Sequence, residues 1–178
     1  MKMKILLLAL PLLVACSSPT SPTSDAPEAA APAALDPNAI VDAQNGYGAH
    51  HLGDSLSSFK GVPLKLVPRI WPAVMYIIPS HNEHLDTLRL DGLGYEFWQG
   101  RLYRINFNSR RPGLLEAGKR MYGQGVQVSP TEHRWQGQRA SADFTVRNTS
   151  NGKVTYLRIS DNAAAAQVDS AVAALRPE

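Results

Sequence analysis

Few side chains in this 178-residue chain are of a type and spacing that could carry out chemistry. The segment His81-Asn82-Glu83-His84, with Asp86 just beyond it, comes nearest to a metal site. A catalytic zinc needs a third protein ligand and an open coordination position. His50 and His51 could supply that ligand only if the fold brings them close. We therefore interpret the segment as a solvated polar loop, with His81 and His84 as the metal-binding alternative.

Motifs of the common enzyme classes are absent from the sequence. It has no Gly-x-Ser-x-Gly elbow, no phosphate-binding glycine loop and no His-Glu-x-x-His pair. Its one cysteine, Cys16, lies close to the start of the chain, so the remainder has no thiol nucleophile. We predict that the protein is not an enzyme and needs no cofactor, and keep a metal-assisted enzyme as a third hypothesis.

Basic side chains are concentrated in the second half of the chain. From Arg101 to Arg158 there are 11 Lys or Arg residues against three acidic ones. Such an excess could face an anionic partner, although arginines that alternate along a strand are also typical of its solvated face. The candidate surface for an anionic partner comprises Arg101, Arg104, Arg134, Arg139, Arg147, Arg158 and Trp98, the tryptophan that we expect to be exposed.

Cys16 follows a segment typical of export signals. Lys2 and Lys4 provide positive charge, an apolar run extends from Ile5 to Val14, and the small residue Ala15 precedes the cysteine. A membrane-spanning helix needs about 20 apolar residues, so this shorter run predicts a cleaved signal peptide over residues 1–15.

Leu13-Val14-Ala15-Cys16 resembles the lipobox of bacterial lipoproteins. The resemblance implies that the Cys16 thiol receives a diacylglyceryl group, that the chain is cut before Cys16 and that the new amino group is acylated. Ser17 resembles the sorting pattern of outer-membrane lipoproteins, because it is not the aspartate that retains such proteins in the inner membrane. The implied location is the periplasmic face of the outer membrane, with the lipid on Cys16 as the membrane contact.

Residues 16–39 are predicted to comprise the lipidated cysteine and a disordered tether. Five prolines and seven alanines follow Cys16 in this stretch, with Leu35 as its one large apolar residue. It cannot bury enough surface to offset the entropy of ordering it. Residues 40–178 are then expected to form a single small periplasmic domain, stabilised by packing because no disulfide is available.

A β-hairpin is predicted at residues 93–107, where aromatic and aliphatic residues alternate with polar ones. We expect a three-residue loop, Gln99-Gly100-Arg101, because a two-residue loop would place Phe97 opposite Leu102 and Tyr95 opposite Arg104. The expected pairs are Phe97–Tyr103, Tyr95–Ile105 and Leu93–Phe107 on the apolar face, and Glu96–Arg104 on the other.

A second hairpin and three helices complete the predicted fold. Pairing Val146 with Thr155 also sets Asp143 opposite Arg158, so the same register suits both faces of the hairpin. We expect helices at residues 54–61, at residues 112–122 and from a cap at Asp161 onward. We expect strands at residues 46–52, 73–78 and 126–135, the last of them broken at Pro130. We therefore predict an α+β domain, with a largely antiparallel sheet and about three helices packed on one face.

Gly94-Tyr95-Glu96-Phe97-Trp98 is similar to a short stretch in membrane-anchored inhibitors of C-type lysozyme. The resemblance implies an inhibitor or immunity protein of a cell-wall-degrading enzyme, although the disulfide of that family cannot form here. The leading hypothesis is a non-catalytic binding or structural module of the envelope. Its expected partner is an envelope protein, peptidoglycan or a lipid head group, and not a nucleic acid.

Overall fold

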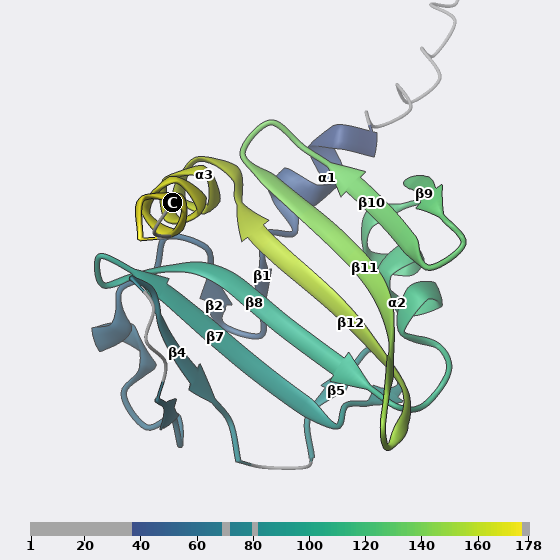
Figure 1. Cartoon of the computed structure of the whole chain (residues 1–178), viewed down its shortest axis with the longest axis horizontal. Helices are drawn as coiled ribbons and strands as arrows, with labels where there is room; N and C mark the ends of the chain where they lie inside the picture. Colours follow the sequence, from purple (N-terminus) through teal and green to yellow (C-terminus); the bar gives the residue numbers. More distant parts are fainter. Residues whose placement is uncertain (1–36, 69–71, 80–81, 176–178) are drawn as a thin grey trace, which may run out of the picture. The chain divides into compact units, whose positions relative to one another are not determined.

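The computed structural model describes residues 37–68, 72–79 and 82–175. The predicted signal peptide, with Cys16 and most of the predicted tether, lies outside these residues. The first helix, α1 (Pro37–Ala43), begins three residues before the predicted start of the domain. Figure 1 shows the arrangement of the elements.

An eight-stranded antiparallel sheet dominates the fold (Figure 1). Two short hairpins accompany it, β1 (Gly46–Tyr47) with β2 (His50–His51) and β5 (His84–Leu85) with β6 (Leu88–Arg89). The order across the large sheet is β3 (Lys65–Val67), β4 (Val74–Ile77), β7 (Gly92–Trp98), β8 (Arg101–Ser109), β12 (Gly152–Asp161), β11 (Ala140–Thr149), β10 (Glu132–Gln136) and β9 (Val126–Ser129).

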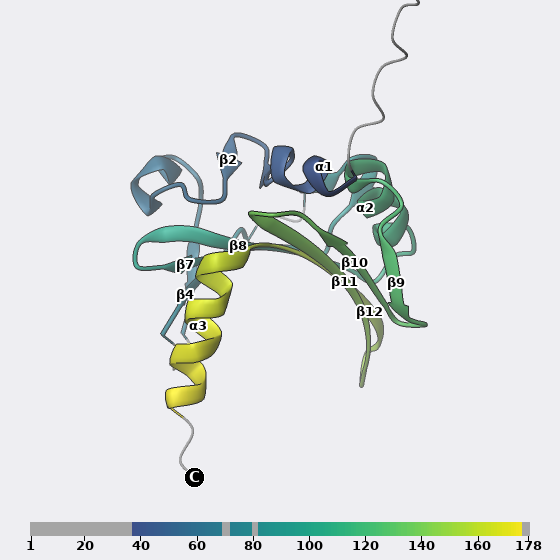
Figure 2. The same cartoon turned by 90° about the horizontal axis from the view of Figure 1, so that it is seen from above.

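The prediction of about three helices on one face of an α+β sheet is wrong. Strands account for 46% of the structure and helices for 23%. Figure 2 shows α1 and α2 (Leu114–Tyr122) on one side of a bent sheet and α3 (Asn162–Ala174) on the other. The reason is a second apolar cluster on the far face, where Ala73 and Tyr103 pack against Val168 of α3. The alternation of residues along the strands did not predict this cluster.

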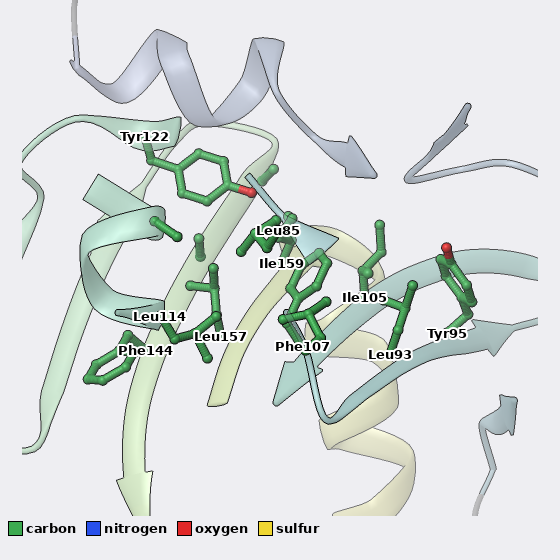
Figure 3. Packing of buried hydrophobic residues seen from close by; sticks show 14 of the residues in the cluster. Leu85, Leu93, Tyr95, Ile105, Phe107, Leu114, Tyr122, Phe144, Leu157 and Ile159 are labelled. Atoms are coloured by element: carbon green, nitrogen blue, oxygen red, sulfur yellow. The ribbon is translucent and has the colours of Figure 1, made fainter. Parts of the chain in front are cut away.

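The main core lies on the face beneath α1 and α2 (Figure 3). The side chains of Ile105, Phe107, Leu157 and Ile159 come from the central strands β8 and β12 and are completely or almost completely buried. Burying apolar surface on this scale is the main stabilising contribution in a domain without disulfides.

The β7–β8 hairpin combines a tight turn with a β-bulge. Trp98 pairs with Arg101, so the loop has two residues, Gln99 (φ 50°) and Gly100 (φ 75°), and Phe97 pairs with Leu102. The predicted three-residue loop and the Phe97–Tyr103 pair are therefore wrong. The register shifts between Glu96 and Phe97, which leaves Tyr103 as the extra residue and restores the other predicted pairs, Glu96–Arg104, Tyr95–Ile105 and Leu93–Phe107.

The β11–β12 hairpin has the predicted register, with Val146 opposite Thr155 and Asp143 opposite Arg158. The helices α2 and α3 and the strand β4 also lie where predicted, and the Asp161 side chain caps α3 by accepting a hydrogen bond from the Ala164 N–H (2.8 Å). The predicted helix at 54–61 is only a short 3₁₀ turn, η1 (Leu56–Phe59). The broken strand at 126–135 forms two paired strands, β9 and β10.

The Asp42 side chain links α1 to the turn between β10 and β11 by hydrogen bonds. Its carboxylate accepts hydrogen bonds from the backbone N–H groups of Gln138 (2.9 Å), Arg139 (2.9 Å) and Ala140 (2.8 Å). Slight burial acts to raise the pKa of Asp42, but these three donors and the charge of Arg139 outweigh it and hold that pKa below its ordinary value. The helix is thus tied to the sheet by polar contacts as well as by the buried Val41.

Candidate functional site

A groove on the α3 side of the sheet brings three of the predicted arginines together. Its volume is about 650 Å³, and Arg104, Arg147 and Arg158 line it together with polar residues of β8 and β12. We call it the arginine groove. Its further lining residues are Ala73, Met75, Glu96, Tyr103, Asn106, Asn108, Tyr156, Val168, Asp169 and Val172.

Strand pairing positions the polar side chains of the groove in cross-strand rows. In one row Asp143, Arg158 and Asn106 lie opposite one another on β11, β12 and β8. In the next, Ser160, Arg104 and Glu96 lie opposite one another on β12, β8 and β7. Because side chains alternate along each strand, all these residues face away from the main core. The same alternation that fills the core therefore builds the groove.

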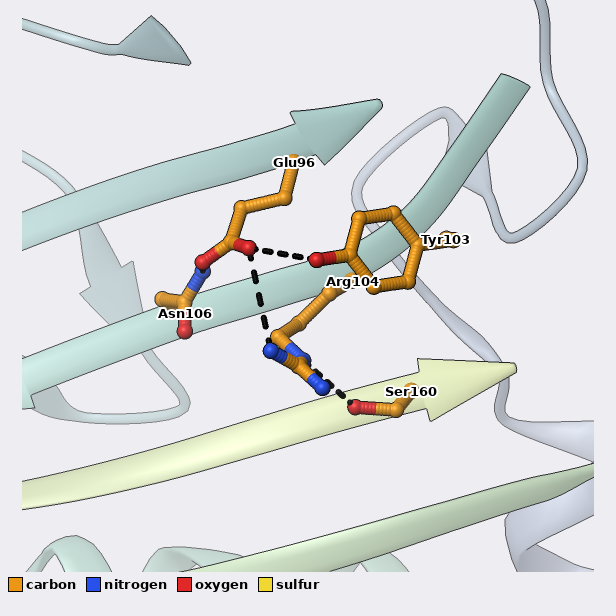
Figure 4. A network of polar contacts seen from close by, with 5 residues as sticks. All are labelled: Glu96, Tyr103, Arg104, Asn106 and Ser160. Atoms are coloured by element: carbon orange, nitrogen blue, oxygen red, sulfur yellow. Dashed lines mark hydrogen bonds and ion pairs between the residues drawn. The ribbon is translucent and has the colours of Figure 1, made fainter. Parts of the chain in front are cut away.

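The bulge at Tyr103 turns a residue expected in the core onto the groove face. There its hydroxyl donates to Glu96 Oε2 at 2.7 Å, and Asn106 Nδ2 donates to Glu96 Oε1 at 3.0 Å (Figure 4). A bulge commonly redirects a side chain in this way. Both oxygens of Glu96, a residue only 7% exposed, thus accept hydrogen bonds.

Arg104 is held in place by the same network. Its Nη1 lies 3.7 Å from Glu96 Oε2 and its Nε donates to Ser160 Oγ at 3.0 Å (Figure 4). The guanidinium also lies over the Tyr103 ring, 5.0 Å from the centroid. Arg104 is therefore paired with Glu96 inside the groove and linked to β12 through Ser160.

Arg147 and Arg158 differ from Arg104 in having no ion pair within the described part of the chain. The Arg147 guanidinium lies over the Tyr156 ring at 5.5 Å. Partial burial, followed by the charges of Arg147 and Arg104, lowers the pKa of the Arg158 guanidinium, and Glu96 and Asp143 offset this only in part. The guanidinium remains charged, since arginine is not deprotonated in proteins. Arg158 thus lies in a region of positive potential.

Helix α3 forms one wall of the groove. Val168 is buried against Ala73 and Tyr103, and Val172 packs at the margin of the same cluster. Trp98 was predicted to be exposed on this face. It does lie there, but it is half-buried beneath α3, with its Nε1 donating to Gln167 Oε1 at 3.1 Å. Along this helix, Val168 and Val172 contact the sheet, whereas Leu175 is exposed.

The other three predicted arginines do not line the groove. Arg134 is on the same face but donates from Nε to Asp143 Oδ1 at 2.6 Å. Arg101 donates to the Gly53 carbonyl at 3.2 Å. Arg139 lies in the turn between β10 and β11, outside the strands. The seven-residue surface predicted from sequence is therefore divided among separate places.

The histidines do not form a metal site in the described part of the chain, where no three metal-binding side chains come together. His84 is exposed, and its Nδ1 lies 2.8 Å from the Asn82 carbonyl. His50 stacks on Phe59, with the ring centroids 3.7 Å apart. His81 and Trp71 are outside the described residues.

None of the described helices is long and apolar enough to span a membrane.

The five residues similar to a stretch in lysozyme inhibitors belong to the interior of the sheet. They lie within β7, where Tyr95 and Phe97 are buried in the main core and Glu96 belongs to the polar network. Most of the stretch therefore lies in the interior of the sheet.

Sequence reasoning missed several groove residues. Tyr156, Asn106 and Asn108 are an even number of residues from Arg158 or Arg104 on their strands, and that spacing could have identified them. Tyr103 could not be found in this way, because the bulge reverses its face. Comparisons with protein-family models, curated proteins and solved structures find no match for this chain.

Proposed function

We propose that this protein is a lipid-anchored component of the bacterial cell envelope whose folded domain binds an anionic ligand in the arginine groove, without catalysis. The observation that carries this proposal is the pair Arg147 and Arg158. Both guanidinium groups line the same groove without an ion pair inside the described part of the chain. Planar guanidinium groups can grip a carboxylate or phosphate with two hydrogen bonds each.

The size of the groove favours a small molecule or a chain end over a flat protein surface. Small-molecule sites typically enclose about 300–1,000 Å³, and the groove, at about 650 Å³, falls within this range. Half-buried Arg158 also faces less competition from water than an exposed arginine would, which strengthens its attraction for an anion.

A binding role without catalysis agrees with the state of the one carboxylate buried in the groove. Glu96 accepts hydrogen bonds from Tyr103 and Asn106 and lies beside Arg104. Neighbouring side chains of the groove thus hold the Glu96 carboxylate in place, as expected for a carboxylate with a structural role.

Thermal unfolding in phosphate tests the binding proposal. The experiment uses the full chain carrying Cys16→Ser, which removes the proposed lipid site. Its thermal unfolding is measured in sodium phosphate and in sodium chloride of equal ionic strength. Phosphate at about ten times its Kd should stabilise the protein by about 1.4 kcal/mol. The double variant Arg147→Gln with Arg158→Gln should lose this gain, and Arg139→Gln, outside the groove, should keep it. Equal phosphate effects on all three proteins would refute the proposal.

The anchor is tested separately. We propose that the domain is held at the periplasmic face of the outer membrane by lipid on Cys16. Cells fed labelled palmitate should label the unchanged protein and not Cys16→Ser, because one thiol carries the diacylglyceryl group. Label that still enters the Cys16→Ser variant would overturn the anchor without affecting the groove.

A further inference from the structure

The two ends of the arginine groove differ in chemistry. Arg147 and Arg158 lie at the β11–β12 end, whereas Ala73 and Met75 lie at the β4 end, opposite the valines of α3. Val168 and Val172 face this second end from the helix. One end therefore suits an anion and the other suits an apolar group.

The distance between these ends follows from the order of the strands. From β4 to β12 the groove crosses β7 and β8, which is three strand spacings. Neighbouring strands lie about 4.8 Å apart, so the two ends are separated by roughly 14 Å. A ligand that reaches both ends must be elongated and lie across the strands.

The middle of the groove disfavours an anion. Glu96 occupies it, and its carboxylate forms an ion pair with Arg104. The amide side chains of Asn106 and Asn108 lie beside it and carry no charge. A ligand charge placed over β7 would meet a carboxylate, whereas one placed over β12 would meet Arg158 and Arg147.

Building on the anion site of the proposed function, we infer that the groove takes an amphipathic anion. A carboxylate or phosphate head lies between Arg147 and Arg158, and an apolar chain extends to Met75, Val168 and Val172. The ligand enters as a free molecule and not as part of a bilayer. The wall formed by α3 and the partial burial of Arg158 would keep a flat membrane surface from reaching that guanidinium.

Isothermal titration of the full chain carrying Cys16→Ser with three probes tests this inference, with dodecanoate kept below its critical micelle concentration and dodecanol below its solubility limit. Dodecanoate has charge and chain, acetate has only the charge, and dodecanol has only the chain. Dodecanoate should bind at least about tenfold more tightly than either of the others, because each lacks one contact. Vesicles of phosphatidylglycerol should not bind, and groove-dependent binding to them would overturn the free-molecule form of the inference.

Variants at the two ends separate the contributions. Arg158→Gln should weaken dodecanoate binding by about tenfold or more, as expected for a lost charged hydrogen bond. Val172→Thr keeps the shape of the side chain, and should weaken dodecanoate by about fourfold while leaving acetate unchanged. Met75→Gln probes the same end from β4 if Val172→Thr loosens α3. The matched controls, Arg139→Gln and Val126→Thr, alter residues outside the groove and should change neither affinity.

Two results would overturn the inference in distinguishable ways. If acetate and dodecanoate bind equally, the apolar end plays no part, and the amphipathic ligand is rejected while the anion site stands. If dodecanol binds as tightly as dodecanoate, the arginines play no part, and both the inference and the proposed function fail.

Discussion

The two faces of the central sheet are built from the same strands but have opposite characters. On one face, aliphatic and aromatic side chains are covered by α1, α2 and the β1–β2 hairpin (Figures 2 and 3). On the other, α3 is the one element of the described residues that covers the sheet, and a polar groove lined by arginines remains beside it. Stability and ligand binding are thus assigned to different faces, so substitutions can affect one and spare the other.

One backbone irregularity links the two faces. The β-bulge lies on β8, opposite Glu96 and Phe97 of β7. It places Leu102 in the core and Tyr103 on the groove face. Tyr103 then supplies both the hydroxyl that bonds Glu96 and the ring that packs against Val168. Without the bulge, Tyr103 would face the core and could make neither contact.

The largest expected effect comes from the core face. Phe107 is fully buried, and its ring meets Tyr47 edge to face with centroids 5.2 Å apart. Phe107→Ala should lower the free energy of unfolding by about 3–5 kcal/mol, because it leaves a cavity. The control is Asn108→Ala, the next residue on β8, which faces the groove and should cost about 1 kcal/mol or less. If urea unfolding shows that Phe107→Ala and Asn108→Ala lose similar free energies of unfolding, the two faces do not differ in their contribution to stability.

An intermediate effect is expected where the groove face contributes to stability. Tyr103→Phe removes the hydroxyl that donates to buried Glu96, and should cost about 1–3 kcal/mol. Tyr156→Phe removes a hydroxyl from the same face of the neighbouring strand. Among the described residues Tyr156 makes a ring contact with Arg147, which does not involve the hydroxyl, so this change should cost less than about 0.5 kcal/mol. If chemical denaturation gives equal values, the Glu96 network does not stabilise the fold.

The smallest effect is expected at the arginines proposed to bind the ligand. Arg147→Gln with Arg158→Gln should change the free energy of unfolding by no more than about 0.5 kcal/mol, because the two like charges destabilise each other. Arg134→Gln should cost up to about 1 kcal/mol, since Arg134 pairs with Asp143. A large loss in the double variant, seen by differential scanning calorimetry, would mean that these arginines are structural.

Local pattern predicted much of the sheet. Alternation and charge pairing together fixed the β11–β12 register, where Asp143 and Arg158 do lie opposite each other. The β7–β8 register was predicted correctly at Glu96–Arg104 but not at Tyr103. A bulge adds one residue without changing the pattern on either side of it, so the sequence is consistent with both a three-residue loop and a two-residue loop followed by a bulge.

The placement of the helices and of the site could be predicted only in part. The alanine-rich stripe of α3 fits either face of a sheet, and only the second apolar cluster decides which face it covers. Arg104, Arg147 and Arg158 could be assigned to one face, but their distance from Arg101 and Arg139 depends on turns and tertiary packing. His50 shows the same limit, because its stacking on Phe59 joins two short segments whose approach no local pattern predicts.

The most direct test of the central claim is a phosphate titration of the Cys16→Ser chain, followed by the Nε–H signals of its arginines in two-dimensional NMR. If the arginine groove binds phosphate, the signals of Arg147 and Arg158 should shift together and saturate at one phosphate concentration, while those of Arg101 and Arg139 follow ionic strength alone. Shifts of similar size at all arginines, without saturation, would show that phosphate does not bind in the groove and that the groove is only the solvated side of the sheet.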